Sequence, residues 1–313
     1  MFRRVSLAAS FFAVLMLIYF AREINLLIPT PVLENQDIYY SYVEGKRLVD
    51  GKNPYARILD GNMRDNQKYA TYFPVFYELS FLSQKMGLHS ASQWMMFWKT
   101  VFMAFEFGIG LLLYLLLARN KLEWIGVFAA AFWMFNRWTL KVVEMGNLDF
   151  IPIFFLVLSL ALFSKNKWWG LFFFSLSLGF KQVAIFLVPI YLIWVWRETL
   201  QNRLRTTFFA GLVIASVPLI SALPFLVWNA KGFILSVMFS ATRNASNQFG
   251  IPSMDVIANL EGLTARLGML ALVAMLYYFV FQGKGRIFFA SFLILSVFLD
   301  FNSVLYSQYP SWV

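Results

Sequence analysis

Long apolar stretches separated by short polar breaks make up most of this chain. A helix that crosses a bilayer needs about 20 mostly apolar residues, and several stretches meet or approach that length. Together they predict nine membrane-spanning helices, at residues 5–27, 91–117, 124–138, 150–163, 168–180, 183–196, 207–228, 263–282 and 287–304. The shorter ones are typical of helices packed inside a bundle. The pattern predicts an all-α polytopic membrane protein with residues 1–313 in a single transmembrane domain.

Two longer polar segments interrupt the pattern, at residues 28–90 and 229–262. Within the first, Asp37–Val49 has the composition of a helix, and Asn53-Pro54-Tyr55 is typical of a turn. Residues 73–88 are short and carry Glu78 and Lys85, so we expect a periplasmic helix that does not cross. The second segment begins with apolar residues 232–239, which are too few to span and suit the membrane interface.

The amino-acid composition limits which side chains can serve as catalytic or metal-binding groups. The chain is 60% hydrophobic and 13% charged, with no cysteine and a single histidine, His89. A disulfide framework, a thiolate nucleophile and a cysteine metal site are therefore excluded, and a histidine-based triad is disfavoured. Acid–base work falls to carboxylates, tyrosines or lysines. No cofactor is predicted, and the metal requirement stays open.

The net charge of +10 is compatible with nucleic-acid binding, but its distribution indicates membrane topology. With the N-terminus inside and the breaks alternating, 11 cations and only two acids, Glu123 and Glu198, face the cytoplasm. Such enrichment of Lys and Arg in short inside loops is the positive-inside bias. We therefore expect the lipid bilayer and no nucleic acid as partner, with both long segments extracytoplasmic. The inside cations are Arg3, Arg4, Arg119, Lys121, Lys165, Lys167, Arg197, Arg203, Arg205, Lys284 and Arg286.

Several charged residues are candidates for chemistry. Asp37, soon after the first span, is a candidate general base, with a helix N-cap as the alternative that spacing alone favours. Lys181, at an outward tip between two apolar helices, suits a lipid phosphate or a lysine that snorkels to the interface. Arg137 and Lys141 fit an anion or sugar contact, or else an interfacial ion-pair cluster. Glu106 fits a structural pair with Lys99, or a polar contact between helices.

Taken in order, several short motifs resemble those of the polyprenol-phosphate-sugar-dependent glycosyltransferases of the GT-C fold, most of all the bacterial mannosyltransferase-like glycosyltransferase family 87. The first periplasmic loop of those enzymes carries an Asp followed by aromatics, a Leu-x-x-Gly-x-Asn-Pro-Tyr turn and a Tyr-Pro-Pro-Leu-x-Tyr helix start. This chain has Asp37-Ile-Tyr-Tyr, Gly45-Lys-Arg-Leu-Val-Asp-Gly-Lys-Asn-Pro-Tyr55 and Tyr72-Phe-Pro-Val-Phe-Tyr77. Further along, Gly146-Asn-Leu-Asp149, Gly179-Phe-Lys-Gln-Val183 and Ser307-Gln-Tyr-Pro-Ser-Trp312 resemble later elements of the family.

The resemblance implies an inverting hexosyltransferase of the bacterial inner membrane, with an extracytoplasmic active site. The donor would be a polyprenyl-phosphate sugar, with mannose or another hexose or pentose transferred to a lipid-linked or cell-envelope glycan acceptor. It implies Asp37 as general base, and it implies Lys181, Arg137 and Arg243 as ligands of the donor phosphate. The implied substrate contacts are Tyr40, Asn53, Tyr55, Tyr72, Asn147, Asp149, Gln182, Gln308 and Tyr309.

The chain departs from the family pattern at three positions. Val75 stands for the second proline, Asn147 for a glutamine and Val183 for a proline, which leaves the sugar undefined. The chain stops soon after an outward crossing, so we expect the C-terminal helices of the family to be absent. Three other classes compete with the glycosyltransferase: a lipid-linked sugar flippase or transporter, an O-antigen ligase or polymerase, and a non-catalytic scaffold.

Overall fold

The computed structural model describes residues 6–27, 36–61, 70–239, 252–260, 262–283, 285–301 and 309–313. Within these ranges every regular element is a helix, which confirms the all-α prediction. The chain forms two compact units: residues 1–52 with 77–158, and residues 53–76 with 159–313. They are called unit 1 and unit 2 here.

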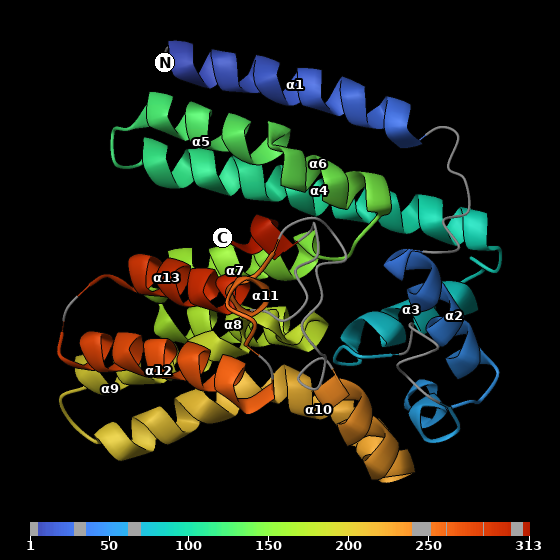
Figure 1. The fold of residues 1–313 in the computed structure, drawn as a ribbon. Coiled ribbons are helices and arrows are strands. Elements are labelled where there is room, and N and C mark those ends of the chain that lie inside the picture. Colours follow the sequence, from blue (N-terminus) through green and yellow to red (C-terminus); the bar gives the residue numbers. More distant parts are fainter. Residues whose placement is uncertain are drawn as a thin grey trace. The chain divides into compact units, whose positions relative to one another are not determined.

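In unit 1 the helices α1, α4 and α5 lie side by side, and α2 and α3 lie at one end of α4 (Figure 1). The boundary between α5 (Glu123–Phe135) and α6 (Arg137–Met145) is Asn136, whose side-chain oxygen accepts hydrogen bonds from the backbone N–H groups of Trp138 and Thr139. The single span expected at 124–138 is therefore broken. The helices are α1 (Leu7–Leu27), α2 (Asp37–Val49), most of α3 (Val75–Lys85), α4 (Ala91–Ala118), α5 (Glu123–Phe135), α6 (Arg137–Met145) and the first part of α7 (Phe150–Phe163).

Close helix approach holds unit 1 together. A Cβ added at Gly126 would lie 3.0 Å from the carbonyl oxygen of Tyr114, so glycine lets α5 pack directly on α4. The ring of Tyr114 stacks on Phe12 of α1 at 4.2 Å. These contacts join the three helices through small and aromatic residues, as in packed membrane helices.

Unit 2 contains the rest of α7 and a set of helices that pack around α8 and α9. Ser159 donates to the carbonyl oxygen of Gly170 at 2.6 Å, and Phe174 stacks on Tyr191 at 4.2 Å. These side chains fix the core of the unit. Its further elements are η1 (Pro54–Leu59), α8 (Lys167–Phe180), η2 (Gln182–Leu187), α9 (Val188–Glu198), α10 (Arg203–Met238), α11 (Met254–Ile257), α12 (Gly262–Phe281), α13 (Ile287–Asp300) and η4 (Tyr309–Trp312).

Two spans expected in unit 2 have different limits in the structure. Residues 183–196 begin as the 3₁₀ segment η2, and the α-helix α9 starts only at Val188, with Pro189 in its first turn. Residues 207–228 belong to the longer α10, whose backbone leaves helical geometry at Asn229 (φ −159°, ψ 84°). The apolar segment 232–239 expected at the interface is thus the arm of α10 beyond that break.

Within the described ranges, three helices are long and apolar enough to cross a membrane: α1, α4 and α10. Four shorter apolar helices, α5, α7, α12 and α13, accompany them. Large apolar side chains lie exposed along α1, among them Leu7, Phe11 and Leu17. Exposed apolar surface on this scale suits contact with lipid rather than water.

Candidate functional site

Asp37 is the first residue of α2. Gln36, in extended conformation, takes the N-cap place, and its side chain makes no capping hydrogen bond. The capping interpretation of Asp37 is therefore wrong. The half-buried carboxylate lies in the first turn of α2, at the positive end of the helix dipole.

The packing of α2 against α3 fixes the direction of the helix that begins with Asp37. Ser80 donates to the carbonyl oxygen of Ser41 at 2.9 Å, and Gln84 donates to that of Tyr42 at 2.9 Å. The Tyr42 hydroxyl donates to the carbonyl oxygen of His89 at 2.6 Å, and burial raises the pKa of this tyrosine. Two of these side chains, Ser80 and Gln84, join α3 to α2, and the Tyr42 hydroxyl joins α2 to the residues just before α4.

The turn Gly146-Asn147 comes close to the start of α2. Gly146 ends α6 in the left-handed conformation (φ 64°), which glycine adopts without strain. A Cβ there would lie 3.1 Å from Cε of Lys99 and 3.2 Å from Cδ1 of Ile38. The residue after Asp37, a lysine of α4 and the Gly-Asn-Leu-Asp element are therefore brought together within unit 1.

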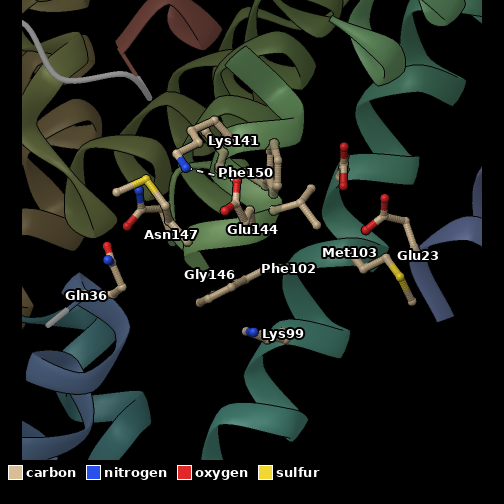
Figure 2. A pocket seen from close by; sticks show the side chains of 14 residues that line it. Glu23, Gln36, Lys99, Phe102, Met103, Lys141, Glu144, Gly146, Asn147 and Phe150 are labelled. Carbon is tan, nitrogen blue, oxygen red and sulfur yellow. Dashed lines mark hydrogen bonds and ion pairs between the residues drawn. The ribbon is translucent and has the colours of Figure 1, made fainter. Parts of the chain in front are cut away.

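A cavity of about 350 Å³ opens between these segments of unit 1 (Figure 2). Gln36 and Lys99 line it beside Gly146 and Asn147, and the Lys141–Glu144 ion pair (2.9 Å) lies along the α6 side. The full lining is Glu23, Gln36, Lys99, Phe102, Met103, Glu106, Lys141, Val142, Val143, Glu144, Met145, Gly146, Asn147 and Phe150.

Glu106 reaches this cavity from the middle of α4. It is fully buried and accepts a hydrogen bond from the Tyr19 hydroxyl of α1. No ion pair joins it to Lys99 in the part of the chain that the structure describes. Of the two sequence interpretations, the polar contact between helices is confirmed. Glu23 and Gln36 did not stand out in the sequence, although a glutamate within an apolar helix is a signal that could have drawn attention to Glu23.

Other predicted residues of unit 1 have clear positions. Arg137 is exposed at the first position of α6, where it lies over the Trp138 ring at 5.5 Å. Tyr40 is half-buried and meets Tyr39 edge-on at 5.8 Å. Asp149 is buried just before α7 and is not among the residues that line the cavity.

In unit 2, Asn53 and Tyr55 build the turn that leads into η1. The Asn53 side chain accepts a hydrogen bond from the Tyr55 N–H at 2.9 Å, so it caps the 3₁₀ helix. The buried Tyr55 hydroxyl donates to the carbonyl oxygen of Tyr72 at 2.7 Å. Its ring packs edge-on against Phe225 and Phe233 of α10. These contacts anchor the segment that carries Tyr72.

Lys181 lies at the break between α8 and η2, in extended conformation. Its side chain is only 2% exposed, with the ammonium 4.8 Å from the centre of the Tyr72 ring and 5.7 Å from that of Tyr309. Gln182 donates to the carbonyl oxygen of Thr71 at 2.7 Å. Three motif segments that are far apart in the sequence thus meet around one cation. We call the group formed by Lys181, Tyr72 and Tyr309 the Lys181 clamp. A buried ammonium does not fit the snorkelling interpretation.

The predicted site residues thus fall into two groups. Asp37, Tyr40, Arg137, Asn147 and Asp149 belong to unit 1, and Asn53, Tyr55, Tyr72, Lys181, Gln182 and Tyr309 to unit 2. Arg243 and Gln308 lie outside the described residues. Among the residues described, no group of three or more His, Asp or Glu side chains is placed to hold a metal ion.

No known protein family matches this chain, and no curated protein matches it. The assignment of a function therefore depends on the residues and their geometry.

Proposed function

We propose that this protein is a GT-C-type membrane glycosyltransferase of a bacterial inner membrane. In this proposal nine helices span the bilayer, the N-terminus is cytoplasmic and residues 28–90 and 229–262 are extracytoplasmic. The enzyme moves a sugar, mannose or another hexose or pentose, from a polyprenyl-phosphate donor to a lipid-linked or envelope glycan acceptor.

The Lys181 clamp is the observation that carries the proposal. A buried charge within apolar surroundings is costly, and such residues most often serve transport or binding. Tyrosine faces attract an ammonium, so the rings of Tyr72 and Tyr309 suit a cationic side chain at this position. A phosphate monoester or diester at a lipid head is an anion that a lysine binds well.

The reaction is a single inverting displacement. Asp37 accepts the proton of an acceptor hydroxyl, whose oxygen forms a bond to the anomeric carbon of the donor sugar. The bond from that carbon to the phosphate oxygen breaks, and polyprenyl phosphate leaves. Lys181 stabilises the negative charge that grows on the departing phosphate.

Transfer of a radiolabelled sugar from polyprenyl-phosphate donors, in membranes that contain the protein, tests the proposal. Asp37→Asn should lower the rate about 100-fold or more, because general-base catalysis contributes about 10²–10⁴-fold. Asp50→Asn is the matched control, since Asp50 is exposed at the other end of the same helix. Normal transfer by Asp37→Asn at equal expression would exclude the base assignment.

For the donor side, Lys181→Met should raise the donor concentration needed for half-maximal rate, whereas Lys231→Met should not. Lys231 is an exposed lysine of α10 and serves as the matched control.

The membrane topology is tested with single-cysteine variants, since the parent chain has no cysteine. Leu200→Cys, 84% exposed after α9, should react from the cytoplasmic side, and Asp60→Cys from the outside. Reaction of Leu200→Cys from outside alone would overturn the arrangement.

A transporter of lipid-linked sugars is the second candidate, and one observation favours it. Glu23, Glu106 and Tyr19 place buried polar groups inside the apolar helices α1 and α4. Polar residues along such a path are typical of transporters. Movement of a fluorescent lipid-linked sugar across proteoliposomes, without any transfer product, would favour this class over the glycosyltransferase.

A further inference from the structure

Among the buried polar atoms of unit 1 that have no hydrogen-bond partner, two belong to residues that line the cavity of Figure 2. One is Nδ2 of Asn147, a donor, and the other is Oε2 of Glu106, whose second oxygen Oε1 accepts from Tyr19. The two residues are 2% and 0% exposed. Leaving a buried polar atom unsatisfied costs about 1–3 kcal/mol, and such atoms are rare in native proteins. A ligand that satisfies both atoms is a direct explanation.

Both residues line the cavity of Figure 2, so they can reach the same ligand. Glu106 follows Lys99 by seven positions on α4, which places the two on one face about 10 Å apart along the helix. Asn147 lies near the Lys99 end, beside Gly146. The cavity therefore offers an acceptor at the Glu106 end, and donors at the end where α2 begins.

The remaining walls are largely apolar. Phe102 and Phe150 border the cavity together with Met103 and Val142. A pocket with apolar walls and a few placed polar groups is typical of small-molecule sites. The volume of 350 Å³ lies near the lower end of the usual range, which is about 300–1,000 Å³.

We infer that this cavity binds a glycosyl unit of one or two rings. One ring hydroxyl donates to Oε2 of Glu106, and a ring or hydroxyl oxygen accepts from Nδ2 of Asn147. The apolar faces of the ring pack against Phe102 and Phe150. In this assignment Glu106 and Asn147 are substrate-binding residues. The choice of a sugar as ligand class rests on the proposed function.

The polar groups disfavour other small ligands. A phosphate dianion offers only acceptors, so it would leave Oε2 of Glu106 without a donor. A purely apolar ligand would leave both buried atoms unsatisfied. A hydroxylated ring offers donors and acceptors at several angles, and so matches one acceptor and one donor on opposite parts of the wall.

Binding is tested on the full chain in lipid nanodiscs by saturation-transfer difference NMR, with methyl α-mannoside and a methyl disaccharide as probes. The parent protein should give a saturable signal. Glu106→Gln and Asn147→Leu should each weaken binding about tenfold or more, since each removes one buried hydrogen bond. Val143→Phe, which fills the cavity without altering either polar group, should abolish the signal.

Ser291→Ala is the matched control, because Ser291 has a buried hydroxyl without a partner but belongs to α13 in unit 2. It should bind the probes like the parent. Equal signals from the parent, Val143→Phe and Asn147→Leu, or no saturable signal from the parent, would overturn the inference. Sugar transfer without probe binding would refute the cavity assignment alone, and probe binding without transfer would refute the proposed function alone.

Discussion

The packing of α2 on α3 leads to a sharp prediction at Gly45. A Cβ added at this glycine would overlap Oγ of Ser80, and would lie 2.6 Å from Cβ of Ser80 and 2.9 Å from Nε2 of Gln84. These two side chains make the hydrogen bonds that hold α2 in place. Gly45→Ala should therefore push apart the two helices that position Asp37.

The size of the effect follows from opposing contributions. Alanine within a helix is more favourable than glycine by about 1 kcal/mol. Overpacking a tight contact costs about 1–3 kcal/mol, and each strained hydrogen bond loses about 0.5–1.5 kcal/mol. The unfavourable contributions exceed the gain, so we expect a net destabilisation of about 1–5 kcal/mol.

Thermal unfolding of the detergent-solubilised protein, followed by tryptophan fluorescence, measures this effect. Gly211→Ala is the matched control, because Gly211 also lies within a helix but no atom comes within 4 Å of an added Cβ. It should unfold at the same temperature as the parent, or slightly higher. Ser80→Gly in the Gly45→Ala background should recover much of the loss. If Gly45→Ala is as stable as the parent, or Ser80→Gly restores nothing, the steric reasoning is refuted.

Three further predictions follow from single contacts. Tyr72→Leu should raise the KM for the donor about 5–30-fold, whereas Tyr72→Phe should leave it unchanged. The reason is that a desolvated cation–π contact to Lys181 contributes about 1–2 kcal/mol. Equal changes in KM in both variants would contradict this prediction. Burial raises the pKa of Glu78 to about 7. The stability that its protonated form contributes is therefore fully present below pH 4.5 and is lost as the pH rises through 7. The melting temperature of Glu78→Gln should lack this decline, and a variant with the same pH profile as the parent would refute the prediction. Asn136→Ala should cost about 1 kcal/mol in denaturant unfolding by removing the cap of α6, and Asn136→Asp should cost less; equal losses would count against the cap.

Local patterns predicted many helices well. Asp37–Val49 and Phe150–Phe163 have the limits expected from the sequence, because helix composition and apolar continuity are both local properties. The break at Asn136 was missed, since an asparagine between two apolar helices does not show whether its side chain turns back to cap the second one. The extension of α10 past Trp228 was missed for a similar reason, because the capping of its second arm by Asn229 depends on conformation.

The candidate site was predicted in part. The family resemblance named Lys181, Tyr72 and Tyr309 as site residues, but spacing alone does not show that residues so far apart in the sequence meet around one cation. The cavity of unit 1 was not predicted either. Its unsatisfied atoms on Glu106 and Asn147 arise from the packing of α1, α4 and α6, which only a three-dimensional arrangement defines.

The anchoring of Tyr55 against α10 has a consequence for the order in which the protein is assembled. A Cβ at Gly232 would lie 2.7 Å from the Tyr55 carbonyl oxygen. The Ser236 hydroxyl also contacts this carbonyl oxygen, and Ser236 follows Tyr55 by 181 positions in the sequence. At synthesis rates of roughly 5–20 residues per second, α10 emerges roughly 10–40 s after Tyr55. During that interval the segment around η1 has left the ribosome without its final partner. A chaperone or insertion factor has its longest opportunity to act there, and arrested chains that end before α10 should show an η1 segment open to protease.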